Sequence, residues 1–278
     1  YIAFISTYVC LTVFEKEWRI TPWGQKEVIL QRLKDYVPGN PEIKSIRVFL
    51  HGPVGAGKSS LINFINSVFQ GHTTSIALAD SAIAGESFTK KYQTHKIGKG
   101  KHGIYYPIVF NDDDIINALK GHVKEGHKFN PMSPLSEEDP GYIKIPSSED
   151  RVHCLVIVMP ADKMAFLREG VIQKIRAVRL AAAEMGIPQM VILTRVDEAC
   201  PLVKKDLKNI YLSKYIKEKC SAKLGVPVNC ILPVKNYHEE IDLNEDMDVL
   251  LLRALRQMVD FADDFIKNIP LKITPQGN

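Results

Sequence analysis

The sequence is poor in the residues that build disulfide frameworks and metal clusters. Its 278 residues include only five cysteines, at positions 10, 154, 200, 220 and 230, and none of them shows CxxC spacing. The eight histidines form neither an HExxH pattern nor a paired ligand spacing. We therefore expect reduced thiols in a cytoplasmic protein, and no zinc site.

The chain also lacks a strong net charge, internal repeats, low-complexity tracts and long apolar runs. A net charge of +4, with the basic residues spread out, gives no argument for a specific nucleic-acid partner. The uncharged opening Tyr1–Phe14 is too short for a transmembrane segment and lacks the basic start of a signal peptide. No Met precedes it, so we expect the chain to begin inside a longer protein. We interpret this opening as a buried strand or the remnant of an upstream domain, with a membrane-contacting segment as the alternative.

What the sequence does contain is a phosphate-binding pattern, HGPVGAGKSS, at residues 51–60. The apolar run IRVFL precedes it and the helix-compatible stretch SLINFINSVF follows it, which is the context that a P-loop requires. Glycines let backbone N–H groups approach phosphate oxygens, Lys58 would reach the β and γ phosphates, and Ser59 would bind Mg²⁺. We therefore predict nucleotide binding by Gly52, Pro53, Val54, Gly55, Ala56, Gly57, Lys58, Ser59 and Ser60.

A second motif, VILTRVD, predicts which base is bound. It brings Thr194, Arg195 and Asp197 to the carboxyl end of a predicted strand, where open α/β sheets bind ligands. A carboxylate can accept from N1–H and the exocyclic amine of guanine, whereas adenine would leave it unpaired, so Asp197 favours GTP or GDP over ATP. Arg195 could lie along the base and ribose. In the next strand end, LPVKNY, a backbone N–H near Lys235 and Asn236 could meet guanine O6.

The alternation of apolar runs and amphipathic stretches predicts an α/β fold with a doubly wound, mostly parallel sheet of the P-loop GTPase type. We expect a helical N-terminal extension (1–37, with a helix over 21–37), a nucleotide-binding domain (38–270) and a short tail (271–278). The expected strands are 46–50, a hairpin of 92–97 with 104–110, then 151–160, 186–197 and 229–234. Helices are expected at 60–69, 168–186, 203–225 and, as a long C-terminal helix, 246–266.

The motifs HGPVGAGKSSLIN, FQGH, ESFTKKY, DRVHCLVIV, LTRVD and LRALRQM, in this order, resemble the interferon-induced protein 44 family from about Trp18 to Pro270. The resemblance implies a GTPase-type domain, a cytoplasmic location, interferon induction and antiviral or antiproliferative roles, and some members carry an upstream TLDc-type domain. Its P-loop falls on Gly52 to Ser59. Its guanine motif, usually TKxD, falls on Thr194 to Asp197, with Arg195 replacing Lys.

One departure concerns the γ-phosphate sensor. GTPases continue the strand corresponding to YPIVFND as Asp, two residues and Gly, but here Asp112 is followed by DDIINALKG, and the nearest glycine, Gly121, is too far along. Either the sensor has been lost, or the sequence omits a segment after Asn111 or Asp112. We expect Asp112 to contact Mg²⁺ through water and Thr89 to complete the coordination, with Thr73 and Thr74 as rivals.

The same comparison bears on hydrolysis. No residue matches the glutamine that orients water in small GTPases, and Val54 stands where those enzymes commonly carry Gly. The leading hypothesis is therefore a slow GTPase or GTP switch. The alternatives are a non-catalytic pseudo-GTPase interaction module and an ATP-using P-loop enzyme. The apolar stripe of the last helix predicts core packing or, alternatively, a surface for a protein partner or self-association. It comprises Leu251, Leu255, Met258, Ala262 and Phe265, with Leu250, Val259 and Ile266 nearby.

Overall fold

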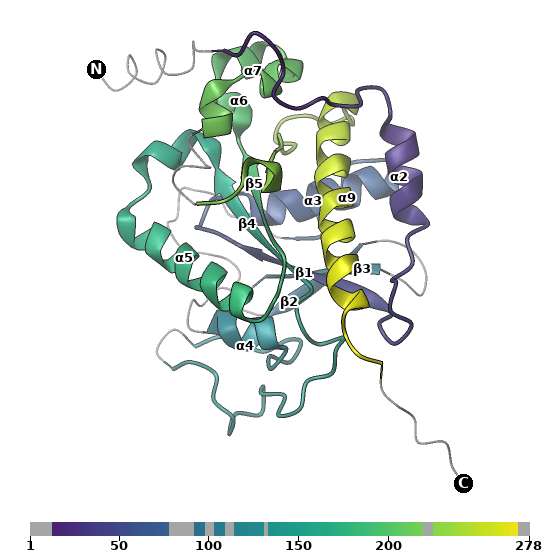
Figure 1. Ribbon diagram of the computed structural model, residues 1–278, viewed down its shortest axis with the longest axis vertical. Coiled ribbons are helices and arrows are strands. Elements are labelled where there is room, and N and C mark those ends of the chain that lie inside the picture. Colours follow the sequence, from purple (N-terminus) through teal and green to yellow (C-terminus); the bar gives the residue numbers. More distant parts are fainter. Residues whose placement is uncertain are drawn as a thin grey trace.

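The fold is built on one twisted sheet of six strands (Figure 1). The computed structural model describes residues 13–77, 92–97, 103–108, 114–130, 133–218 and 225–271. The strand order is β2-β3-β1-β4-β5-β6, in which β2 is antiparallel to β3 and every other pair is parallel. This order confirms the doubly wound sheet of the P-loop GTPase type and the expected hairpin. The bounds are β1 (Ser45–His51), β2 (Gln93–Ile97), β3 (Gly103–Ile108), β4 (Cys154–Pro160), β5 (Gln189–Thr194) and β6 (Ile231–Pro233).

Helices cover both faces of the sheet, because alternate side chains of each central strand point to opposite sides. One core joins α2 (Lys26–Lys34), α3 (Lys58–Gln70) and α9 (Glu245–Lys267) to the sheet. The opposite core joins α4 (Ile115–Lys120), α5 (Glu169–Glu184), α6 (Val196–Ala199) and α7 (Pro201–Lys205). β4 lies in the middle and is buried at all its positions, as its continuous apolar sequence predicts.

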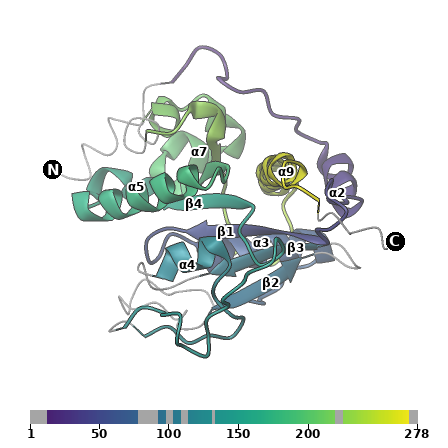
Figure 2. The same cartoon turned by 60° about the horizontal axis from the view of Figure 1, so that its bottom comes forward.

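The C-terminal helix α9 packs lengthwise on the sheet and beside α2, as Figures 1 and 2 both show. Asn244 caps it, because its side-chain oxygen accepts the Met247 N–H at 3.0 Å. Most of the predicted stripe is buried, which confirms the core interpretation: Leu250, Leu251, Leu255, Met258, Val259, Ala262 and Ile266. These residues are therefore unavailable to a partner. Buried Ile29, Leu30 and Leu33 of α2 complete this core.

The single helix expected over 203–225 is wrong. α7 ends at Lys205, and Asp206 takes an extended conformation (φ −150°, ψ 117°). Its carboxylate accepts the backbone N–H of Lys208 at 2.9 Å and so begins a 3₁₀ turn over Leu207–Tyr211. Short acidic side chains compete with helical hydrogen bonds in this way, and the apolar periodicity conceals it.

The cysteines differ in their bonding state. Cys200 is buried and disulfide-bonded, whereas Cys154 and Cys230 are free. The expectation that all the cysteines are reduced is therefore wrong. The absence of CxxC spacing does not exclude pairing between more distant cysteines. None of the helices within the described ranges has the length and apolar character needed to cross a membrane.

Candidate functional site

A cavity of about 730 Å³ opens at the carboxyl ends of the central strands, where three loops meet. The loops follow β1, β5 and β6, and we call the last of them, Lys235–Glu240, the base loop. This is the edge at which parallel sheets bind ligands. The lining residues are Gly55, Gly57, Ser60, Arg195, Asp197, Glu198, Lys204, Lys235, Asn236, Tyr237, His238, Glu239 and Glu240.

The loop after β1 requires its glycines. A Cβ on Gly52 would lie 2.1 Å from the carbonyl oxygen of Val158, so the loop contacts β4 at a distance that only glycine allows. Gly57 begins α3 with φ +86°, and a Cβ there would lie 2.9 Å from Nδ2 of Asn236. Gly55 has φ +74° and open space around it. The loop therefore has the close backbone approach and strained angles of a phosphate cradle.

Lys58 and Ser59 open α3, the helix whose N-terminus faces the cradle. Lys58 Nζ donates to the carbonyl oxygens of Gly52 at 2.8 Å and Pro53 at 3.0 Å, so the ammonium lies over the loop. Ser59 is buried beside it. The backbone N–H groups of the first helical turn and the positive end of the helix dipole add to this charge. The combined site is suited to a polyanion.

Thr194 holds the loop rather than lining the cavity. It is fully buried at the end of β5, and its hydroxyl lies 2.7 Å from the carbonyl oxygen of Ala56 and 3.3 Å from that of Met159. The strand that carries the predicted base motif is thus bonded directly to the P-loop. Of the other loop residues, Ala56 is buried and Val54 is 47% exposed at the tip.

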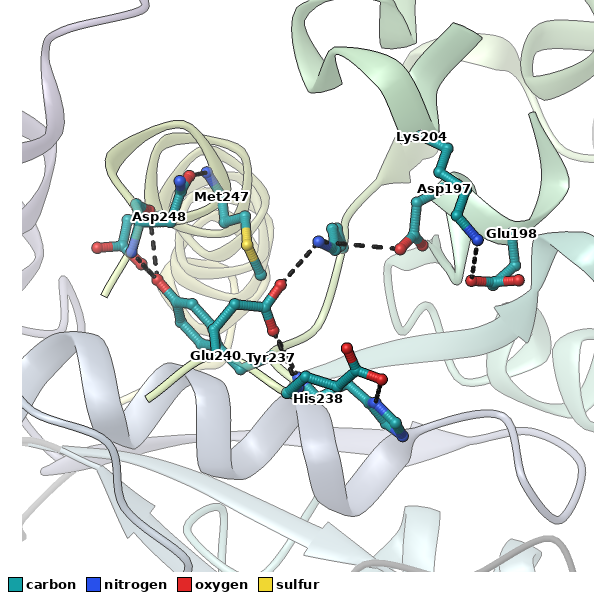
Figure 3. Close-up of polar contacts among 11 residues, drawn as sticks. Asp197, Glu198, Lys204, Tyr237, His238, Glu240, Met247 and Asp248 are labelled. Carbon is teal, nitrogen blue, oxygen red and sulfur yellow. Dashed lines mark hydrogen bonds and ion pairs between the residues drawn. The ribbon is translucent and has the colours of Figure 1, made fainter. Parts of the chain in front are cut away.

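Asp197 and Glu240, both labelled in Figure 3, form a charged row along the cavity wall together with Lys235, which pairs with both. Lys235 Nζ lies 2.7 Å from Oε1 of Glu240 and 3.9 Å from Oδ2 of Asp197. Burial alone would raise the pKa of Glu240, but the His238 N–H and the Lys235 ammonium outweigh it and lower that pKa to about 2. The wall thus presents a carboxylate acceptor and an ammonium donor as neighbours.

Arg195 is the only non-glycine residue with positive φ in the described ranges, at φ 56°. Its Nε lies 3.2 Å from Oδ2 of Asp162, in the 3₁₀ turn Ala161–Phe166 that follows β4. Burial raises the pKa of Asp162, and the Arg195 guanidinium opposes that rise. The side chain is therefore held across the cavity rim by an ion pair.

The base loop is bonded to the P-loop through Asn236. Its Nδ2 donates to the carbonyl oxygen of Gly57 at 3.2 Å, and its buried Oδ1 has no hydrogen-bond partner in the described part of the chain. Tyr237 follows, and its ring meets Phe64 of α3 edge-on at 4.5 Å. Six of the lining residues were not predicted from the sequence: Glu198, Lys204, Tyr237, His238, Glu239 and Glu240. The polar run YHEE at 237–240 was the available signal for the last four.

Of the predicted Mg²⁺ ligands, Ser59 is at the cradle, whereas Thr89 and Asp112 lie outside the described residues. The rival Thr74 bonds to Asn66 and Ser67 near the far end of α3, away from the cradle. Asp114 is buried and accepts the Leu135 N–H at 2.7 Å.

Gly121 ends α4 with φ +87°. A Cβ there would lie 2.7 Å from the Asp150 carbonyl carbon, so this glycine serves local packing.

No family model matches the chain. It is 35% identical over 263 residues to interferon-induced protein 44 of Homo sapiens, a match covering 89% of this chain and 59% of that protein. It is 32% identical over 263 residues to interferon-induced protein 44-like of Homo sapiens, covering 88% of this chain and 58% of that protein. It is 33% identical over 258 residues to interferon-induced protein 44 of Mus musculus, covering 87% and 61%. The chain therefore spans about three-fifths of the length of these curated relatives.

Among solved structures, Toc33 from Arabidopsis thaliana in complex with GDP and Mg²⁺ matches with a TM-score of 0.45 and 12% identity, covering 86% of this chain and 91% of that one. A structure from work on the dimerization and GTPase activity of the chloroplast translocon components atToc33 and psToc159 matches with a TM-score of 0.49 and 13% identity, covering 89% and 91%.

Proposed function

We propose that the chain, which is similar to interferon-induced protein 44 over 89% of its length, belongs to that family and is a guanine-nucleotide switch with slow hydrolysis. One observation carries the proposal. The cavity that the P-loop lines has the Asp197 carboxylate and the Lys235 ammonium side by side, 3.9 Å apart.

This pair complements the edge of guanine. The Asp197 carboxylate would accept from N1–H and the exocyclic amine, and the Lys235 ammonium would donate to the adjacent O6. Adenine has an acceptor at N1 and an amine where guanine has O6, so both contacts would be lost. Asp197 and Lys235 are only 19% and 28% exposed as side chains, which makes an unsatisfied partner costly.

The phosphates would lie on the cradle from Gly52 to Ser60, with Lys58 moving from the loop carbonyls to phosphate oxygens. Mg²⁺, bound with the Ser59 hydroxyl, would neutralise phosphate charge. No glutamine lines the described part of the cavity, and exposed Val54 at the loop tip would crowd an arginine supplied by a partner. These two features support slow intrinsic hydrolysis.

The names of the relatives support a role in the interferon response, and we extend it to antiviral or antiproliferative action in the cytoplasm. A nucleotide-dependent switch acts by changing its affinity for a partner. We therefore propose a protein partner, or a second copy of the chain, that contacts the nucleotide-binding domain.

The test is calorimetric titration of nucleotide-free protein with GDP, a nonhydrolysable GTP analogue and ATP, each with Mg²⁺. We expect both guanine nucleotides to bind and ATP to bind at least 100-fold more weakly. Asp197→Asn should prefer xanthosine diphosphate over GDP, because the new amide donates to the xanthine carbonyl that replaces the guanine amine. The control Glu184→Gln, on the exposed end of α5, should behave as the unmodified protein.

The outcomes separate the alternatives. Equal binding of ATP and GDP, with no effect of Asp197→Asn, would favour an ATP-using enzyme. If no nucleotide binds, the proposal fails and the pseudo-GTPase interaction module remains.

A further inference from the structure

A buried carboxylate lies behind the base loop. Asp248, in the first turn of α9, is 0% exposed. Lys26 of α2 places its Nζ 2.9 Å from Oδ2, and the Tyr237 hydroxyl donates to Oδ1 at 2.7 Å (Figure 3 shows the Tyr237–Asp248 bond). An acidic residue in the first turn of a helix is usually solvated, where it complements the helix dipole. Full burial with two side-chain partners from two other segments indicates a different use.

Tyr237 connects Asp248 to the cavity. Its hydroxyl donates to Asp248 and accepts the backbone N–H of Asn244, which uses both functions of a phenol. Its ring packs edge-on against Phe64 of α3. Because Tyr237 follows Asn236 directly and lines the cavity itself, its hydroxyl fixes the base loop from behind.

Lys26 stabilises the ionised Asp248 carboxylate that holds the Tyr237 hydroxyl. Burial raises the pKa of the Asp248 carboxyl, and the Lys26 ammonium and the Tyr237 hydroxyl oppose the rise. Without Lys26 the carboxylate would be an uncompensated buried charge, which proteins avoid by taking up a proton or by opening to water. Either response weakens the charged acceptor that holds the Tyr237 hydroxyl, because hydrogen bonds to ionised groups are the stronger ones.

We propose that Lys26, on the helix that precedes the P-loop strand, is a positioning residue for the base loop, and that it acts through Asp248 and Tyr237. As a contribution to guanine-nucleotide affinity, this inference rests on the proposed function. The positioning itself is a property of the nucleotide-free protein. Lys26 is not among the described residues that line the cavity, so we expect its effect on a ligand to pass through Asp248 and Tyr237.

The experiment compares Lys26→Met, which keeps the length and removes the charge, with Lys26→Arg, which restores it. Lys34→Met, at an exposed position of the same helix, is the matched control. Hydrogen–deuterium exchange of nucleotide-free protein should be at least tenfold faster in residues 234–244 of Lys26→Met and unchanged in α5. GDP affinity should fall about tenfold, recover in Lys26→Arg and remain constant in Lys34→Met.

Tyr237→Phe removes only the hydroxyl and covers the case in which Lys26→Met does not fold. It should loosen the same residues, and in the double variant the two effects should not add. Unchanged exchange in residues 234–244, or a uniform increase that includes α5, overturns the inference. If the unmodified protein binds no guanine nucleotide while Lys26→Met still loosens residues 234–244, the proposed function fails and the positioning stands.

Discussion

Replacing Thr194 by Val tests whether β5 holds the P-loop in place. The substitution keeps the shape of a fully buried side chain and removes its hydroxyl, which lies 2.7 Å from the Ala56 carbonyl oxygen and 3.3 Å from that of Met159. A net hydrogen bond contributes about 1 kcal/mol, and a buried group that loses its partner costs about 1–3 kcal/mol. We therefore expect Thr194→Val to lower the free energy of unfolding by about 1–3 kcal/mol.

The assay is thermal unfolding with and without GDP. For a domain of this size, that loss corresponds to a midpoint lower by roughly 2–10 °C. The released loop should also bind GDP about tenfold more weakly, a loss of about 1.4 kcal/mol. Thr194→Ser keeps the hydroxyl and loses one methyl group, so it should cost about 1 kcal/mol and leave GDP affinity unchanged. Equal stability and equal affinity of Thr194→Val and the unmodified protein would refute the role of Thr194 as a link.

Two further predictions concern the P-loop glycines and the buried His153. Gly52→Ala should abolish nucleotide binding in the calorimetric titration, since its Cβ would lie 2.1 Å from the Val158 oxygen. Gly55→Ala should lower the free energy of unfolding by only the roughly 1–2 kcal/mol of a positive φ. Normal binding by Gly52→Ala would contradict the geometry. Burial, the largest cause, lowers the pKa of fully buried His153 to about 4. The folded state therefore excludes a proton that the unfolded state takes up below about pH 6.5, so stability present above that pH should fall by up to about 3 kcal/mol as pH falls to 4. Urea unfolding of His153→Gln should lack this component of the pH slope, and equal slopes would contradict it.

The elements follow from local patterns, and so they could be predicted from the sequence. The apolar run of β4, the hairpin and the buried stripe of α9 each depend on side-chain periodicity and burial alone. The helix expected over 203–225 failed where the Asp206 side chain competes with the backbone, which periodicity cannot reveal.

The site was predictable only in part, because some of its contacts join residues that are far apart in the sequence. The glycines, Lys58 and Asp197 belong to short motifs whose spacing carries their chemistry. By contrast, the contact of Asn236 with Gly57 joins residues 179 positions apart. Asp248 has the sequence position of a solvated helix start, and its burial depends on where Lys26 and Tyr237 arrive. Such contacts need the three-dimensional arrangement.

The position of α9 after every described strand of the sheet has a consequence for synthesis. β1 leaves the ribosome long before the helix that covers one of its faces, so its apolar side chains stay uncovered while the rest of the chain is made. Pairing across so large a separation is slow, and exposed strands are prone to aggregate. Nascent or truncated chains that lack α9 should therefore depend on chaperones, and stop codons upstream of residue 245 should yield insoluble product rather than a shortened working domain.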